Sequence, residues 1–95
     1  MSKSLKVELM GAARIVAGRR EVGVSLAEDA TWRDAAGAVG REAPALVGEV
    51  IAKNKRDLVG GYAFNLGGRD FVLDLDEVVE PPESGHVTLM DFSDL

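Results

Sequence analysis

Residues 5–26 read LKVELMGAARIVAGRREVGVSL, and this stretch decides the fold. Both ends of it alternate between apolar and polar side chains, with the apolar positions at Leu5, Val7, Leu9, Val22, Val24 and Leu26. Alternation with a period of two predicts two strands that each bury one face. Gly11 and Gly18 bracket the residues between them, which predicts a loop. Two strands joined by a connection of this length form an antiparallel hairpin.

After the hairpin the period changes to that of a helix. Thr31 followed by Asp34 predicts an N-cap with a capping box. The next apolar side chains share one helical face, namely Trp32, Ala35, Ala36 and Val39. Pro44 suits the first turn of a second, shorter helical piece. Further along, residues 62–66 alternate as a strand, Gly67-Gly68 predicts a hairpin turn, and residues 77–80 predict another short strand.

The predicted order of hairpin, helix and short strands defines a fold class. A single helix has to cover one face of a mixed sheet, because so short a chain needs every strand to bury against it. We therefore expect an α+β, ubiquitin-like β-grasp domain with a mixed four- to five-stranded sheet packed on one main helix. Residues 87–92 read VTLMDF, which suits a possible extra C-terminal strand. The expected organisation is a β-grasp domain over residues 1–85 and a C-terminal extension over residues 86–95.

The composition excludes several kinds of site. The chain has 95 residues, no cysteine and one histidine, so disulfides, thiolate metal sites and sites with two imidazoles are excluded, and we expect no metal and no cofactor. The net charge is −5 and every Lys and Arg lies at or before Arg69, which disfavours nucleic acid as a partner. No stretch has the length and apolarity of a signal peptide or membrane span, so we expect a soluble cytoplasmic protein.

Residues 61–85 carry a family resemblance. They read GYAFNLGGRDFVLDLDEVVEPPESG. Asn65 at a strand end, the Asp-x-Asp-Glu-Val run at 74–78 and the Pro-Pro-Glu-Ser-Gly run at 81–85 resemble the C-terminal half of the ubiquitin-like sulfur carriers, the MoaD/ThiS type. These are the small subunit of molybdopterin synthase and the carrier of the thiamine pathway. Leu75 stands where that family usually has glycine.

The resemblance implies a function with one difficulty. Members of that family end at a second glycine, whose carboxylate an activating enzyme adenylates before it becomes a thiocarboxylate. Here His86 stands at that position and residues 86–95 follow. An internal carbonyl cannot be adenylated, so the resemblance implies a sulfur carrier of molybdenum cofactor or related biosynthesis only after the tail is removed at Gly85. The implied partners are proteins, an activating enzyme or a larger synthase subunit, and the chain itself is not an enzyme.

The composition of the tail favours another interpretation. Five of the ten residues after Gly85 are apolar, namely Val87, Leu89, Met90, Phe92 and Leu95. An exposed tail of this kind would promote aggregation, so an added edge strand or a partner contact explains it better. The chain would then be a non-covalent β-grasp interaction module, or a small subunit of a larger enzyme complex.

The remaining candidate residues are possible contacts with partners. Arg14, Arg19 and Arg20 form a small basic patch that would suit an acidic protein surface or a phosphate. Tyr62 and Phe64 share a strand face and are candidate contacts if that face is exposed. The tail motif itself consists of Pro81, Pro82, Ser84, Gly85 and His86. His86 has no second ligand or nucleophile near it in the sequence, and we expect it to act neither as a base nor as a metal ligand.

Overall fold

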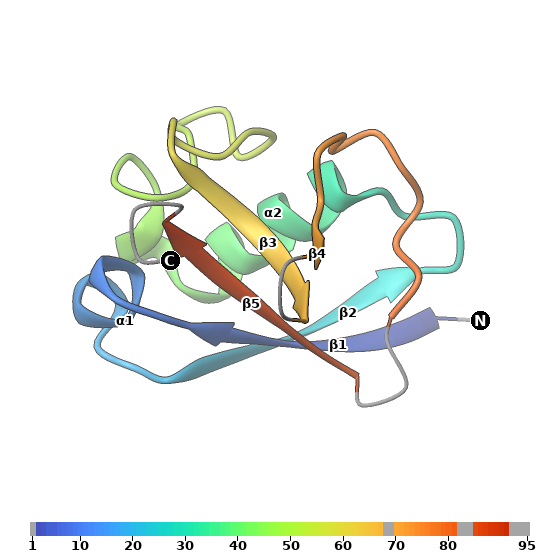
Figure 1. Cartoon of the computed structure of the whole chain (residues 1–95), viewed down its shortest axis with the longest axis horizontal. Coiled ribbons are helices and arrows are strands. Elements are labelled where there is room, and N and C mark those ends of the chain that lie inside the picture. Colours follow the sequence, from blue (N-terminus) through green and yellow to red (C-terminus); the bar gives the residue numbers. More distant parts are fainter. Residues whose placement is uncertain (1, 68–69, 82–84, 92–95) are drawn as a thin grey trace.

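A computed structural model of the chain describes residues 2–67, 70–81 and 85–91. The elements run in the order β1 (Ser2–Leu9), α1 (Ala12–Ala17), β2 (Glu21–Ala27), α2 (Trp32–Glu42), a 3₁₀ turn η1 (Pro44–Leu46), β3 (Tyr62–Gly67), β4 (Asp70–Phe71) and β5 (His86–Asp91). They form one five-stranded sheet with the order β2-β1-β5-β3-β4, and α2 lies across one face of it (Figure 1). This mixed sheet on one main helix confirms the predicted ubiquitin-like β-grasp fold.

The β1–β2 hairpin is antiparallel, as predicted, but its connection contains a helix. Residues 12–17 read AARIVA, and alanine and arginine favour a helix strongly enough to support this short one once it packs on the domain. Ala13, on the inner face of this helix, is buried. Gly18 ends the helix in the left-handed conformation, with φ of 69°, and its N–H donates to the carbonyl of Arg14 at 2.9 Å. The expectation of a plain loop between Gly11 and Gly18 was therefore wrong.

The main helix α2 begins as the sequence predicts. The Thr31 hydroxyl accepts a hydrogen bond from the Asp34 amide at 3.3 Å, and the Asp34 carboxylate accepts one from the Thr31 amide at 3.0 Å. Its predicted apolar face is buried. A Cβ atom placed on Gly37 would lie 2.7 Å from the carbonyl oxygen of Lys55, so the glycine allows the following loop to cross the helix closely.

The last strand, β5, occupies the centre of the sheet. It pairs parallel to β1, with Val7 opposite Val87, and antiparallel to β3, with Phe64 opposite Leu89. The sequence predicted an added edge strand here, so its position was wrong: residues 86–91 complete the sheet. The boundary expected between residues 85 and 86 thus falls at the entry to the central strand, and residues 92–95 lie outside the described part.

Residues 77–80 do not form the strand that was expected. Val78 makes a single bridge to Thr31 and is half exposed, while Val79 is buried. This segment crosses the start of α2, where the Trp32 amide donates to the Glu77 carbonyl at 3.0 Å. The segment therefore closes one end of the core and leads into the connection before β5.

The core lies between α2 and the inner face of the sheet. The rings of Trp32 on α2 and Phe64 on β3 stand 5.2 Å apart between their centroids. The largest fully buried side chains around them come from every layer of the fold, namely Leu5, Val7, Val22, Val39, Leu46, Val50, Ile51, Val79, Val87 and Leu89. Two of these belong to β5, so the segment after Gly85 supplies part of the core.

Candidate functional site

Gly85 lies at the entry to β5 and is tied to the neighbouring strand. Its carbonyl accepts a hydrogen bond from the Lys6 amide at 2.8 Å, and its φ is 72°, in the region that favours glycine. The next residue, His86, pairs with Lys6 in the parallel register of β1 and β5. Of the predicted tail motif, Pro81 is half-buried, and Pro82 and Ser84 lie outside the described residues.

Thiocarboxylate formation at Gly85 stays a prediction, and the position of Gly85 in the fold shows what cleavage there would remove. Cleavage after Gly85 would remove β5, including the buried side chains of Val87, Leu89 and Met90. Burying one such side chain contributes about 1.5–3 kcal/mol, so the three together account for about 5–9 kcal/mol. A domain of this length is stable by about 5–14 kcal/mol in total. A chain that ends at Gly85 therefore loses most of its stability as well as the middle of its sheet.

His86 faces the outer side of the sheet, away from α2. Its Nδ1 atom lies 3.8 Å from an Oε1 of Glu8 on β1. A shallow hollow of about 470 Å³ lies beside it, with Ser4, Gly23, Ser25 and Gly85 in its lining. Within residues 2–67, 70–81 and 85–91, no three His, Asp or Glu side chains gather as metal ligands would. Lys6 and His86 line the same hollow, beside these small residues.

The two aromatic residues of β3 differ in exposure. Phe64 is fully buried against Trp32, so the exposure on which its expected partner contact depended is not met. Tyr62 is half-buried and packs against the core cluster. Both residues occupy the inner side of the strand, because Phe64 stands opposite Leu89, a core residue. An aromatic contact on the outer sheet face is therefore not present at these positions.

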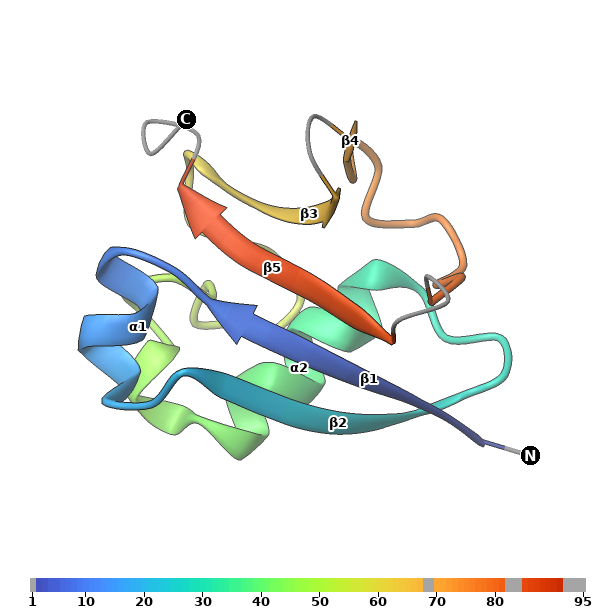
Figure 2. The same ribbon diagram turned by 60° about the horizontal axis from the view of Figure 1, so that its bottom comes forward.

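The three arginines of the predicted basic patch do come together. Arg14 lies on α1, and Arg19 and Arg20 lie in the turn that leads from α1 to β2. All three are exposed and line one surface hollow of about 390 Å³ with Ile15 and Gly18. Figure 2 shows α1 at the end of the sheet toward which the arrowheads of β1 and β5 point. The patch therefore stands beside the end where the chain leaves β5.

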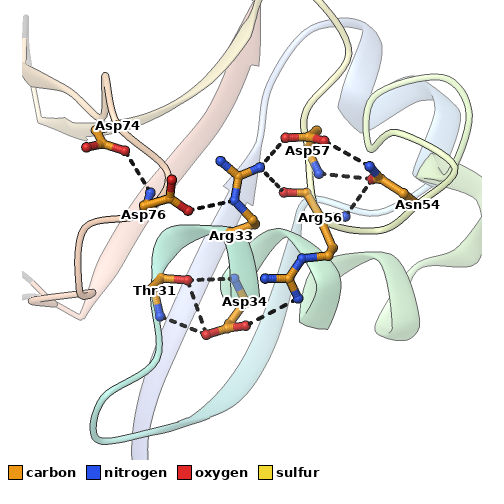
Figure 3. Close-up of polar contacts among 8 residues, drawn as sticks. All are labelled: Thr31, Arg33, Asp34, Asn54, Arg56, Asp57, Asp74 and Asp76. Carbon is orange, nitrogen blue, oxygen red and sulfur yellow. Dashed lines mark hydrogen bonds and ion pairs between the residues drawn. The ribbon is translucent and has the colours of Figure 1, made fainter.

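A polar cluster around Arg33 was not predicted (Figure 3). The Arg33 guanidinium binds the carboxylate of Asp57, the Asp76 carboxylate at 2.8 Å and the Arg56 carbonyl at 3.1 Å. Asn54 donates to the second oxygen of Asp57 at 2.8 Å. One arginine on α2 thus fastens two loops that are distant in sequence. No sequence pattern connects Arg33 with Asp57 or Asp76, because the three residues are distant in the chain.

The cluster shifts the pKa values of Arg33, Asp57 and Asp76. Hydrogen bonds from Asn54 and from Arg33 hold the pKa of Asp57 below its ordinary value. The hydrogen bond from Arg33, with the charge of that guanidinium, lowers the pKa of Asp76. The pKa of Arg33 is raised, chiefly by its hydrogen bond to Asp76. All the charges therefore stay in place at neutral pH, and the cluster is a structural clamp.

Of three comparisons with known proteins, the one with solved structures found matches, and they share the fold of this chain. No family model matches the chain, and no curated protein matches it. The arrangement of strands and helix defines a ubiquitin-like β-grasp protein. Among solved structures, the crystal structure of SAMP1 from Haloferax volcanii is 27% identical, covers 94% of both chains and has a TM-score of 0.75. A crystal structure of small archaeal modifier protein 1 from H. volcanii is 25% identical, covers 90% of this chain and 93% of that chain, and has a TM-score of 0.71.

A third structure shares the fold alone. The solution structure of the H. volcanii HVO 2177 protein is 19% identical, covers 93% of this chain and 81% of that chain, and has a TM-score of 0.68. No helix in the described part of the chain has the length and apolar character needed to cross a membrane.

Proposed function

We propose that this chain is a ubiquitin-like module without catalytic activity, which acts by binding other proteins while residues 86–91 remain in place as its central strand. The observation that carries the proposal is the position of β5 between β1 and β3. Similarity to small archaeal modifier protein 1 over 90% of the chain supports a role that depends on protein partners. A partner would meet a folded surface, because the segment after Gly85 belongs to the core.

A second candidate function is a modifier or sulfur carrier whose reactive carboxylate lies beyond Asp91. The name of the similar modifier protein favours it, and so does the direction of β5, which carries the chain toward α1. The more specific role in molybdenum cofactor biosynthesis depends only on the resemblance of residues 61–85. Its terminal motif, at 81–85, precedes the central strand here instead of following it.

The experiment that separates these functions is an intact mass measurement on the protein from its own cells. The binding module predicts that every folded species keeps residues 86–91. A species that ends at Gly85, with one sulfur in place of oxygen, would contradict the proposal. A species that carries sulfur or a covalent partner beyond Asp91 would instead establish the second candidate.

Crosslinking of the full chain in the same cells tests partner binding itself. We expect crosslinks to a saturable protein partner from the full chain and from a variant that ends at Asp91, because both retain β5. A variant that ends at Gly85 is the matched control for capture of unfolded chains. Crosslinks that the control shows equally would contradict a specific binding function.

A further inference from the structure

The surface around α1 has a charge opposite to that of the whole protein. Arg14, Arg19 and Arg20 are three of the 11 basic residues of a chain with net charge −5. They lie within a single turn and helix, and we call them the arginine patch. Arg14 and Arg20 line a second hollow of about 370 Å³, so the patch borders two adjacent depressions. Its field attracts negative charge that the rest of the surface repels.

Apolar side chains stand within this basic surface. Ile15 is 81% exposed and Met10 is 45% exposed. Ala13 is buried and Val16 packs against the core, so these two side chains form the inner face of α1 while Ile15 lies on its outer face. Exposed apolar side chains bordered by charge are typical of surfaces that bind another protein.

The acidic side chains near the arginine patch do not neutralise its positive charge. Glu8 and Glu21 line the second hollow together with Arg14 and Arg20. Glu8 faces His86 at 3.8 Å, and no ion pair joins an arginine of the patch to a carboxylate within the described residues. Arg19 donates from Nε to the carbonyl of Glu21 at 3.0 Å, which fixes the direction of its side chain. The guanidinium groups are therefore positioned at the surface and accessible.

The patch is also coupled to the end of the central strand. The Met10 amide donates to the Leu89 carbonyl at 3.2 Å, and the Leu9 amide donates to the Arg20 carbonyl at 2.7 Å. A partner that covers α1 would thus lie beside the point where β5 ends (Figure 2).

From these observations we infer that α1 and the turn after it form the docking site for an acidic peptide segment of a partner protein, whose apolar side chain covers Ile15 and Met10. The inference rests on the proposed function and names the partner chemistry of that module. Carboxylates of the segment would meet the arginine patch, where guanidinium groups favour planar acids. The apolar contact then selects a peptide over a free phosphate, which has no surface for Ile15.

The test uses the isotope-labelled full chain and a synthetic amphipathic peptide rich in glutamate, leucine and phenylalanine. Two further peptides serve as probes: one replaces glutamate by lysine, and one replaces the apolar residues by serine. We expect amide shifts concentrated at residues 10–21 with the first peptide only. Arg14→Glu should weaken binding by about tenfold or more, because it reverses one charge at the contact. Lys53→Glu, an exposed control with the same charge change, should leave binding nearly unchanged.

The apolar contact has its own variant. Ile15→Ser should weaken binding by about fivefold or more, since it removes apolar area from the contact. Because Ile15 is 81% exposed, this variant should leave the stability of the fold nearly unchanged. Equal binding by Ile15→Ser, or inorganic phosphate that displaces the peptide, would overturn the inference in favour of an anion site. Self-association that maps to the same residues would overturn it in favour of a second copy of this chain.

Failure here is distinct from failure of the proposed function. Shifts that appear on the outer sheet face around Lys6 and His86 would overturn the docking site and leave a protein-binding module. An absence of shifts with all three peptides would overturn the docking site alone, because the crosslinking experiment measures partner binding independently.

Discussion

Replacing Leu89 by alanine tests whether β5 is part of the core. Leu89 is fully buried and stands between Leu9 on β1 and Phe64 on β3. Truncation of a buried leucine to alanine costs about 2–5 kcal/mol, since it combines lost burial with a cavity. For a domain whose whole stability is about 5–14 kcal/mol, that is a large fraction. With a urea dependence of about 1.5 kcal/mol per molar, a loss of about 3 kcal/mol lowers the unfolding midpoint by about 2 M.

The matched control is Leu73→Ala, because Leu73 is 89% exposed. Its expected effect is within about 0.5 kcal/mol. The assay is urea unfolding of the full chain, followed by Trp32 fluorescence and far-ultraviolet circular dichroism together. Trp32 reports on the core because its ring lies beside Phe64. If Leu89→Ala and Leu73→Ala shift the midpoint equally, residues 86–91 are not a core strand and the reasoning fails.

Three further predictions concern the cap, a close contact and pH. Thr31→Ala should cost about 1 kcal/mol in urea unfolding by removing the capping box; no change would show that the cap is dispensable. Gly37→Ala should destabilise the fold by about 1–3 kcal/mol, because its Cβ atom would clash with the backbone carbonyl of Lys55. Gly23→Ala is the control, since the space around its Cβ position is open. The same urea midpoint for both variants would refute the close contact. Asp57 and Asp76 have folded pKa values below the ordinary 3.8, so their contribution to stability is present above 3.8 and is lost as the pH falls through the folded values; carboxyl titration by NMR that gives ordinary values would contradict the clamp.

Local patterns in the sequence were enough to predict the fold. The alternation in residues 5–9 and 22–26 and the cap at Thr31 each depend on neighbouring residues, so they predicted the hairpin and α2 correctly. Residues 87–92 were predicted to suit a strand, and residues 86–91 form one. Their place in the sheet could not be read from them, because a strand's partners lie far away in the chain and the same alternation suits an edge or a centre.

The position of the candidate site in the sheet could not be predicted for a related reason. Residues 77–80 were expected to form a short strand, and the runs at 74–78 and 81–85 carried the resemblance to the sulfur carriers. In the structure only Val79 among residues 77–80 is buried, and the central strand starts at His86. Whether a short apolar run becomes a strand depends on how it is buried. The adjacent residues Val78 and Val79 do not show this in the sequence. The arginine patch was predicted because its residues are close in sequence, whereas the Arg33 clamp joins loops that the sequence does not connect.

Hydrogen exchange across residues 87–90 of the full chain tests the central claim most directly. A strand with neighbours on both sides directs its successive N–H groups to β1 and β3 alternately, so its amides exchange only when the whole domain unfolds. The account predicts protection of these amides equal to that of residues 5–9 in β1. Exchange as fast as that of the exposed turn at residues 28–29 would show that the segment lies outside the sheet, and the case for an intact binding module would be lost.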